Sequence, residues 1–145
     1  MRRILIVLLT LATLGIAALI CIFRTSPPVV VLHTASVAWL PPSAKDVSSY
    51  ETEGFGWRRS YECTLSEAEF RTFAASKGWP LKEAKNVFPP RIPGLPALRT
   101  VKDFEEPINL IPEALALDNA SHSGGAMIVI FDRELSRMFY LQSHR

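Results

Sequence analysis

The sequence predicts an α+β protein: a single N-terminal transmembrane helix followed by a small antiparallel sheet, arranged ββ-α-βββ, with one packed helix. Three observations lead to this fold class. An apolar run of twenty residues comes first, period-two alternation marks several later segments, and one segment carries signals for both ends of a helix. We expect a cytoplasmic stub and anchor over 1–24, a linker over 25–36 and an extracytoplasmic domain over 37–145.

The anchor is predicted over Ile4–Phe23, which contains no charged residue. Twenty helical residues cover about 30 Å, the thickness of a bilayer's hydrocarbon core. Arg2 and Arg3 precede the run and only Arg24 closely follows it, so the positive-inside rule predicts a cytoplasmic N-terminus and an external C-terminal domain. The positions that mark the span are Ile4, Leu8, Leu11, Gly15, Leu19 and Phe23.

Two other interpretations of this segment fit its residues less well. A cleavable signal peptide has a shorter apolar core that ends in small residues, whereas Leu19, Ile22 and Phe23 are bulky. A lipoprotein would be modified at Cys21, but Ile20 stands where the lipobox has Gly, Ala or Ser. Length and flanking charges favour the uncleaved anchor.

The charge distribution separates the anchor from the domain. Three of the 16 Lys and Arg residues flank the apolar run, which leaves 13 against 14 acidic residues in the rest of the chain. A nearly neutral domain lacks the basic surface that binds nucleic acid, so we expect no nucleic-acid partner. The predicted anchor and orientation instead indicate the lipid bilayer and another envelope protein as partners. Cys63 is the only cysteine beyond the anchor, which leaves a buried free thiol or an intermolecular bridge.

A hairpin and a helix open the predicted domain. Val47–Glu53 and Trp57–Thr64 alternate as strands around a glycine-containing turn. For the helix Glu67–Lys77, Ser66 and Glu69 form a capping box, and the Gly78 and Pro80 positions end it. Earlier in the chain, Val29–Leu32 is either a short strand or a spacer, and Trp39 packs into the core or lies at the membrane interface.

The C-terminal half combines a proline-rich crossing with a meander. Six prolines between Phe88 and Pro112 predict an extended segment, whose apolar side chains lie against the core. Three strands then complete the sheet: Ala114–Leu117, Ala126–Phe131 and Arg137–Ser143.

One polar loop, Asp118–Gly125, is the candidate for chemistry. Asp118, Ser121 and His122 offer a carboxylate, a hydroxyl and an imidazole, but adjacent residues rarely converge into a working site, so a solvated hairpin loop is favoured. His122 could also activate Cys63 across the sheet, although the position of Cys63 on an apolar face argues against that pairing. The histidines are not at metal-ligand spacings, so no metal or cofactor is expected.

A resemblance covers most of the domain. The run from Leu40 to Val47 (LPPSAKDV) and the helix start from Ser66 to Phe70 resemble small membrane-anchored or lipoprotein-type bacterial proteins of unknown function. The Gly-Gly strand, Asp-Arg turn and aromatic strand of Gly124–Tyr140 resemble the end of the same proteins. The resemblance implies a fold and a compartment, and it carries no catalytic residues.

Three functions follow as hypotheses. The first is a non-enzymatic, membrane-tethered domain that binds a partner or ligand in the bacterial envelope. The second is an envelope hydrolase or transferase that uses the Asp118–Gly125 loop. The third is an accessory subunit of a membrane complex, in which the anchor itself carries part of the function.

Overall fold

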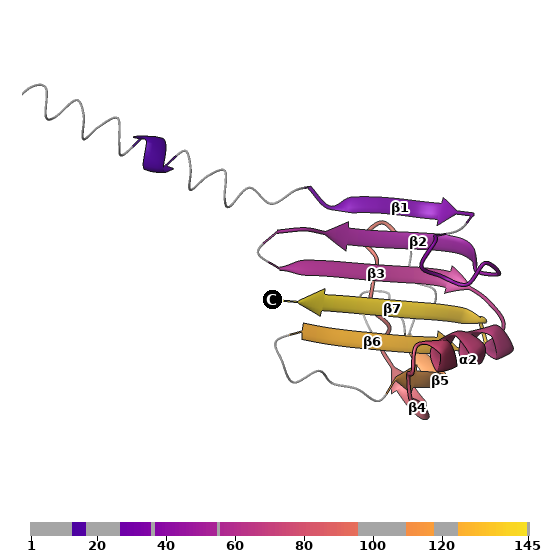
Figure 1. Ribbon diagram of the computed structural model, residues 1–145. Helices are drawn as coiled ribbons and strands as arrows, with labels where there is room; N and C mark the ends of the chain where they lie inside the picture. Colours follow the sequence, from indigo (N-terminus) through magenta and orange to yellow (C-terminus); the bar gives the residue numbers. More distant parts are fainter. Residues whose placement is uncertain are drawn as a thin grey trace, which may run out of the picture.

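The computed structural model describes residues 13–16, 27–35, 37–54, 56–95, 110–117 and 125–144. In these residues the domain is mostly β, an open antiparallel sheet of seven strands with helix α2 packed across one end (Figure 1). The elements are β1 (Val29–Thr34), β2 (Lys45–Thr52), β3 (Trp57–Thr64), α2 (Glu67–Ser76), β4 (Leu81–Val87), β5 (Ile111–Leu117), β6 (Gly125–Asp132) and β7 (Arg137–His144).

Two meanders make up the sheet. The spatial order is β1-β2-β3-β7-β6-β5-β4, so the first three strands form one meander and the last four form the other. They meet where β7 pairs with β3 over eight residue pairs, from Trp57 opposite His144 to Thr64 opposite Arg137. Strands β1 and β4 are therefore the two edges of the sheet.

Most of the predicted elements are present. The antiparallel sheet with one packed helix is confirmed, as are the hairpin of β2 and β3 and the meander of β5, β6 and β7. The helix begins after Ser66 with the predicted capping box, and Lys77 is its C-cap. Gly78 follows in a left-handed conformation with φ 67°, which glycine adopts without steric cost.

The predicted ββ-α-βββ arrangement was wrong in its strand count. Val29–Leu32, for which strand and spacer were both open, belongs to β1 and pairs with β2. Strand β4 was missed because LKEAKNV has no period-two apolar pattern and little intrinsic strand preference. Its backbone becomes a strand through tertiary pairing with β5, so the arrangement is βββ-α-ββββ.

The predicted anchor lies almost wholly outside the described residues. Only residues 13–16 of it are described, and these four are helical. Within the described part of the chain, no helix has both the length and the apolar character required to cross a bilayer. Arg2 and Arg3, on which the orientation depends, are also outside the described residues.

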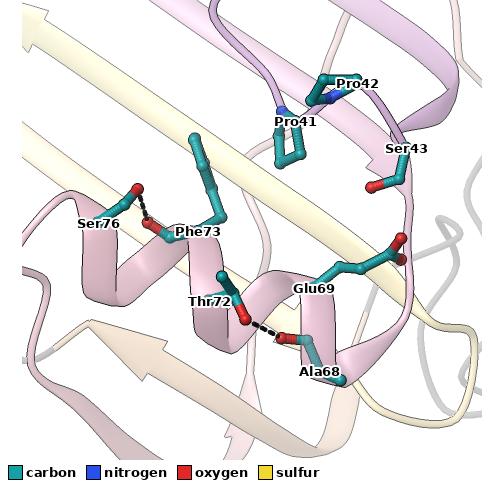
Figure 2. Close-up of a pocket in the computed structure, with 8 residues that line it drawn as sticks. All are labelled: Pro41, Pro42, Ser43, Ala68, Glu69, Thr72, Phe73 and Ser76. Atoms are coloured by element: carbon teal, nitrogen blue, oxygen red, sulfur yellow. Dashed lines mark hydrogen bonds between the residues drawn. The ribbon is translucent and has the colours of Figure 1, made fainter.

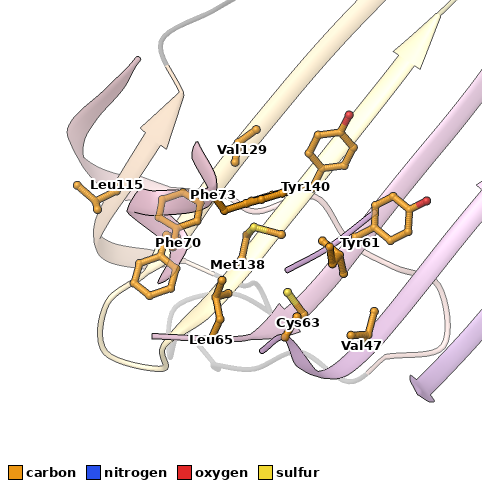
Figure 3. Close-up of a cluster of buried hydrophobic side chains, with 13 residues drawn as sticks. Val47, Tyr61, Cys63, Leu65, Phe70, Phe73, Leu115, Val129, Met138 and Tyr140 are labelled. Carbon is orange, nitrogen blue, oxygen red and sulfur yellow. The ribbon is translucent and has the colours of Figure 1, made fainter. Parts of the chain in front are cut away.

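The larger core lies between the sheet and α2, on what we call the helix-side face (Figure 3). Phe70 of the helix stacks on Phe131 of β6 with 4.8 Å between ring centroids, and both side chains are fully buried. Burial of one such side chain contributes about 1.5–3 kcal/mol to folding. The buried members are Leu40, Ala44, Val47, Tyr61, Cys63, Leu65, Phe70, Phe73, Leu115, Val129, Phe131, Met138 and Tyr140.

The other face of the sheet, the opposite face, is also covered. A smaller apolar cluster lies there, formed by Ile111, Ala114, Ala116, Ile130 and Phe139. Residues 88–95 pass behind the sheet (Figure 1), where the Arg91 carbonyl accepts a 3.4 Å hydrogen bond from Arg58 and Gly94 lies beside Leu32. Ile92 and Leu95 are buried, as predicted for apolar side chains of the crossing.

Candidate functional site

A groove lies between α2 and the loop that joins β1 to β2, and we call it the α2 groove (Figure 2). Its volume is about 440 Å³ and it is open to solvent. Its lining residues are Pro41, Pro42, Ser43, Ala68, Glu69, Thr72, Phe73 and Ser76.

The loop wall of the groove is rigid because its backbone is fixed on both sides. Pro41 and Pro42 have constrained φ angles, and the Ala44 amide donates a 2.9 Å hydrogen bond to the Pro41 carbonyl. Leu40 and Ala44, which flank the prolines, are buried in the larger core. The wall is therefore held in place without a ligand.

The helix wall is set by the cap of α2. The Ser66 hydroxyl accepts from the Glu69 amide at 3.3 Å, and the Glu69 carboxylate accepts from the Ser66 amide at 2.9 Å. Such a cap stabilises a helix by about 1 kcal/mol. The hydrogen bonds from Ser66 hold the pKa of Glu69 below its ordinary value, so this carboxylate is ionised in the groove.

Two hydroxyl groups of the groove donate to carbonyls of the helix itself. Thr72 donates to the Ala68 carbonyl at 2.9 Å, and Ser76 donates to the Phe73 carbonyl at 2.7 Å (Figure 2). The surface left for a ligand is then mainly the hydrocarbon of Pro41, Pro42 and Ala68, since Phe73 is largely buried. Such surfaces suit apolar side chains.

Aromatic rings support the groove from below. Trp39 contacts Phe73 edge-on at 5.4 Å and lies 4.5 Å from Tyr140, measured between ring centroids. Of the two possibilities for Trp39, core packing is therefore the one found. Lys77 adds a positive charge, because its Nζ lies 5.4 Å from the Trp39 ring centroid and 5.3 Å from that of Phe73.

A second polar cluster, the Arg137 row, lies on the opposite face and runs from solvent into the protein. His33 Nδ1 lies 2.5 Å from Asp46 Oδ1, and Asp46 Oδ2 lies 2.8 Å from Arg137 Nη2. Arg137 Nε lies 2.6 Å from Glu62 Oε1, an ion pair that does not meet hydrogen-bond geometry. His33 and Asp46 have φ angles of 55° and 51° at irregularities in β1 and β2, which bring the two side chains together.

The two carboxylates of the Arg137 row have opposite pKa shifts. The hydrogen bond with His33, supported by Arg137, holds the pKa of Asp46 below its ordinary value. Burial raises the pKa of Glu62, which is only 4% exposed, although Arg137 opposes that change. The row therefore pairs a carboxylate stabilised by its partners with one that burial destabilises.

Sequence reasoning missed both of these sites. The proline pair and the helix were each predicted, but no local signal indicates that they face each other. The His33–Asp46 contact joins residues 13 positions apart through two strand irregularities that a period-two pattern does not reveal.

The candidate residues Asp118, Ser121 and His122 lie outside the described residues, so the hydrolase or transferase hypothesis stays a prediction. The described ends of that loop are Leu117 and Gly125, and Gly125 pairs with His144 at one end of β7. The start of α2 lies at the other end of β7, where the Leu65 amide donates to the Ser136 carbonyl. The Gly125 end of the loop thus lies away from the start of α2.

Cys63 is a buried free thiol, as expected for its place on the apolar face. Burial raises the pKa of Cys63 to about 12, so the thiol is protonated and a poor nucleophile at neutral pH. Within the described ranges, no group of three His, Cys, Asp or Glu side chains could hold a metal ion.

In comparisons with known proteins, no protein-family model, curated protein or solved structure matches this chain.

Proposed function

We propose that this protein is a non-enzymatic binding domain, held outside the bacterial cell membrane by its N-terminal helix, and that the α2 groove binds a short apolar segment of another envelope protein. The observation that carries the proposal is the groove itself. Its loop wall is fixed by two prolines and the Ala44 hydrogen bond, its surface is mainly apolar, and the Thr72 and Ser76 hydroxyl groups donate to helix carbonyls. A preformed site avoids the entropy cost of ordering on binding.

The dimensions favour an extended peptide segment as the occupant. The helix wall from Ala68 to Ser76 is about 12 Å long at 1.5 Å per residue. An extended chain of about four residues has the same length. Glu69 lies toward one end of this wall and Lys77 follows its other end, so their opposite charges favour one direction of the bound segment.

Site-specific photo-crosslinking in the native membrane tests this function. A photoreactive residue at Thr72 of the full chain should form an adduct with another envelope protein, whereas one at Lys85 on β4 should not. Ala68→Trp fills the groove and should reduce the Thr72 adduct by about tenfold. Equal adducts at both positions, or an adduct that Ala68→Trp leaves unchanged, would contradict binding in the groove.

Exchange of the anchor separates this function from that of an accessory subunit. A binding domain needs only to be held at the membrane, so an unrelated single span in place of Ile4–Phe23 should preserve the Thr72 adduct. Loss of the adduct with normal membrane insertion would instead favour the accessory-subunit hypothesis.

A further inference from the structure

Strand β1 leaves one edge of the sheet open in the described residues. It pairs with β2 on one side and is the last strand in the spatial order. In an antiparallel strand, alternate residues direct their backbone N–H and C=O groups toward each side. The outward groups of β1 can therefore pair with a further strand.

The side chains of this edge are apolar and exposed. We define the β1 edge as Val29–Leu32, whose four side chains are 59%, 42%, 39% and 39% exposed. Natural sheets usually protect an edge with charges, prolines or bulges. The β1 edge carries no charge and no proline; Pro27 and Pro28 precede it, and the irregularity in its pairing with β2 falls between Val31 and Thr34.

The other edge of the same sheet is protected. Strand β4 exposes Lys82, Glu83 and Lys85, and Asn86 takes a left-handed conformation with φ 53°. Charged side chains and a local change of twist both disfavour pairing with another strand. The chain therefore blocks pairing at β4 and permits it at β1.

A second copy of the chain fits the β1 edge. We propose that two copies pair antiparallel along β1, with Val30 opposite Val30 of the other copy, to join their sheets into one. The two strands run in opposite directions from this central pair, so Val29 of one copy lies opposite Val31 of the other. This register pairs the three valines Val29, Val30 and Val31, which precede the irregularity between Val31 and Thr34.

The predicted anchor brings the two edges together. Only five residues separate Phe23 from Val29, a distance of at most about 22 Å for extended chain. Both β1 edges are then held near one membrane surface, which raises their effective concentration. In the proposed register the two Val29 Cα atoms lie about 8–9 Å apart, which is close to the 8–10 Å spacing of packed helices.

Disulfide cross-linking in membranes tests the pairing and its register. In full chain carrying Cys21→Ser, Val30→Cys should cross-link to a dimer under mild oxidation, because paired Cα atoms lie within disulfide reach. Val29→Cys should cross-link about tenfold less, since two such residues lie beyond about 7 Å. Lys82→Cys on the protected edge is the matched control.

Two results would overturn the proposal. One is a Val30→Cys dimer yield no higher than that of Lys82→Cys, and the other is an equal yield at Val29 and Val30. Protection of Val29→Cys and Val30→Cys from a membrane-impermeant maleimide, without cross-linking, would indicate lipid contact instead. Membrane fractionation of each variant shows separately whether the anchor inserts, so failure of the anchor and failure of pairing are distinguishable.

A charge variant provides the second measurement. Val30→Lys places two like charges opposite each other only if the copies pair in this register. Dimer content is measured by counting photobleaching steps of a fluorescently tagged full chain in vesicles, a method that does not depend on the reactivity of the introduced lysine. Val30→Lys should reduce the dimer fraction about tenfold while Lys82→Glu leaves it unchanged; equal effects would contradict pairing at β1.

Discussion

The two faces of the sheet are stabilised by different interactions. The helix-side face buries stacked aromatic rings against α2, with Phe70 and Phe131 at its centre. The opposite face buries Ser48, Ser60 and Glu62 beside the smaller apolar cluster, and the charge of Glu62 is balanced by Arg137. Apolar packing tolerates small changes of position, whereas a buried ion pair depends on both partners. The comparison therefore predicts that the two faces respond differently to substitution.

The helix-side face should show the largest loss. Phe70→Ala removes a fully buried ring and leaves a cavity against Phe131, which should lower the free energy of unfolding by about 3–5 kcal/mol. Urea unfolding of the full chain in detergent micelles, followed by tryptophan fluorescence, measures this loss. Thr72→Ala, exposed on the same helix, is the control. A loss below about 1 kcal/mol for Phe70→Ala would show that the helix contributes little to the core.

The opposite face should depend on the balance of charge. Arg137→Met leaves the buried Glu62 carboxylate, opposite Phe139 in the β3–β7 pairing, without its cation, and should cost about 3 kcal/mol at pH 7. The double variant Glu62→Met/Arg137→Met removes both charges and should recover most of that loss. The same urea unfolding experiment measures both variants. If the double variant is as unstable as Arg137→Met, the side-chain packing of Arg137 matters more than its charge.

The smallest effect is expected at the exposed end of the Arg137 row. The pKa of Asp46 is lowered in the folded protein, so its ionised form stabilises the fold above the ordinary value of 3.8. Because Asp46 is partly exposed, Asp46→Asn should cost at most about 1 kcal/mol at pH 6. That difference should disappear as the pH falls below 3.8 through the lowered pKa of the folded state.

The two carboxylates of the row should differ in the sign of their pH dependence. The pKa of Glu62 is raised by burial, so its contribution to stability is fully present at acid pH and is lost as the pH rises through that pKa. Unfolding of Glu62→Gln and Asp46→Asn between pH 3 and pH 7 compares the two. A difference between Asp46→Asn and the unsubstituted protein that grows on acidification would contradict the lowered pKa of Asp46.

The two faces also differ in how well the sequence predicted them. On the helix-side face, Cys63 of β3 is buried as its predicted place on an apolar face required, and the capping box located α2 to within one residue. On the opposite face, Ser60 and Glu62 have the polar character of a solvated surface but are buried. Polarity indicates exposure only when nothing else covers the face, and residues 88–95 cover this one.

Local chemistry in the sequence thus determined the helix and its ends, the β2–β3 hairpin and the C-terminal meander. These features depend on residues close together in the chain, whose capping groups, glycines and alternation act over a few positions. Tertiary structure alone decided that β4 is a strand, that β1 is an open edge, and that Pro41 and Pro42 face α2 across a groove. Each of these depends on contacts between distant segments, which no local pattern of side chains specifies.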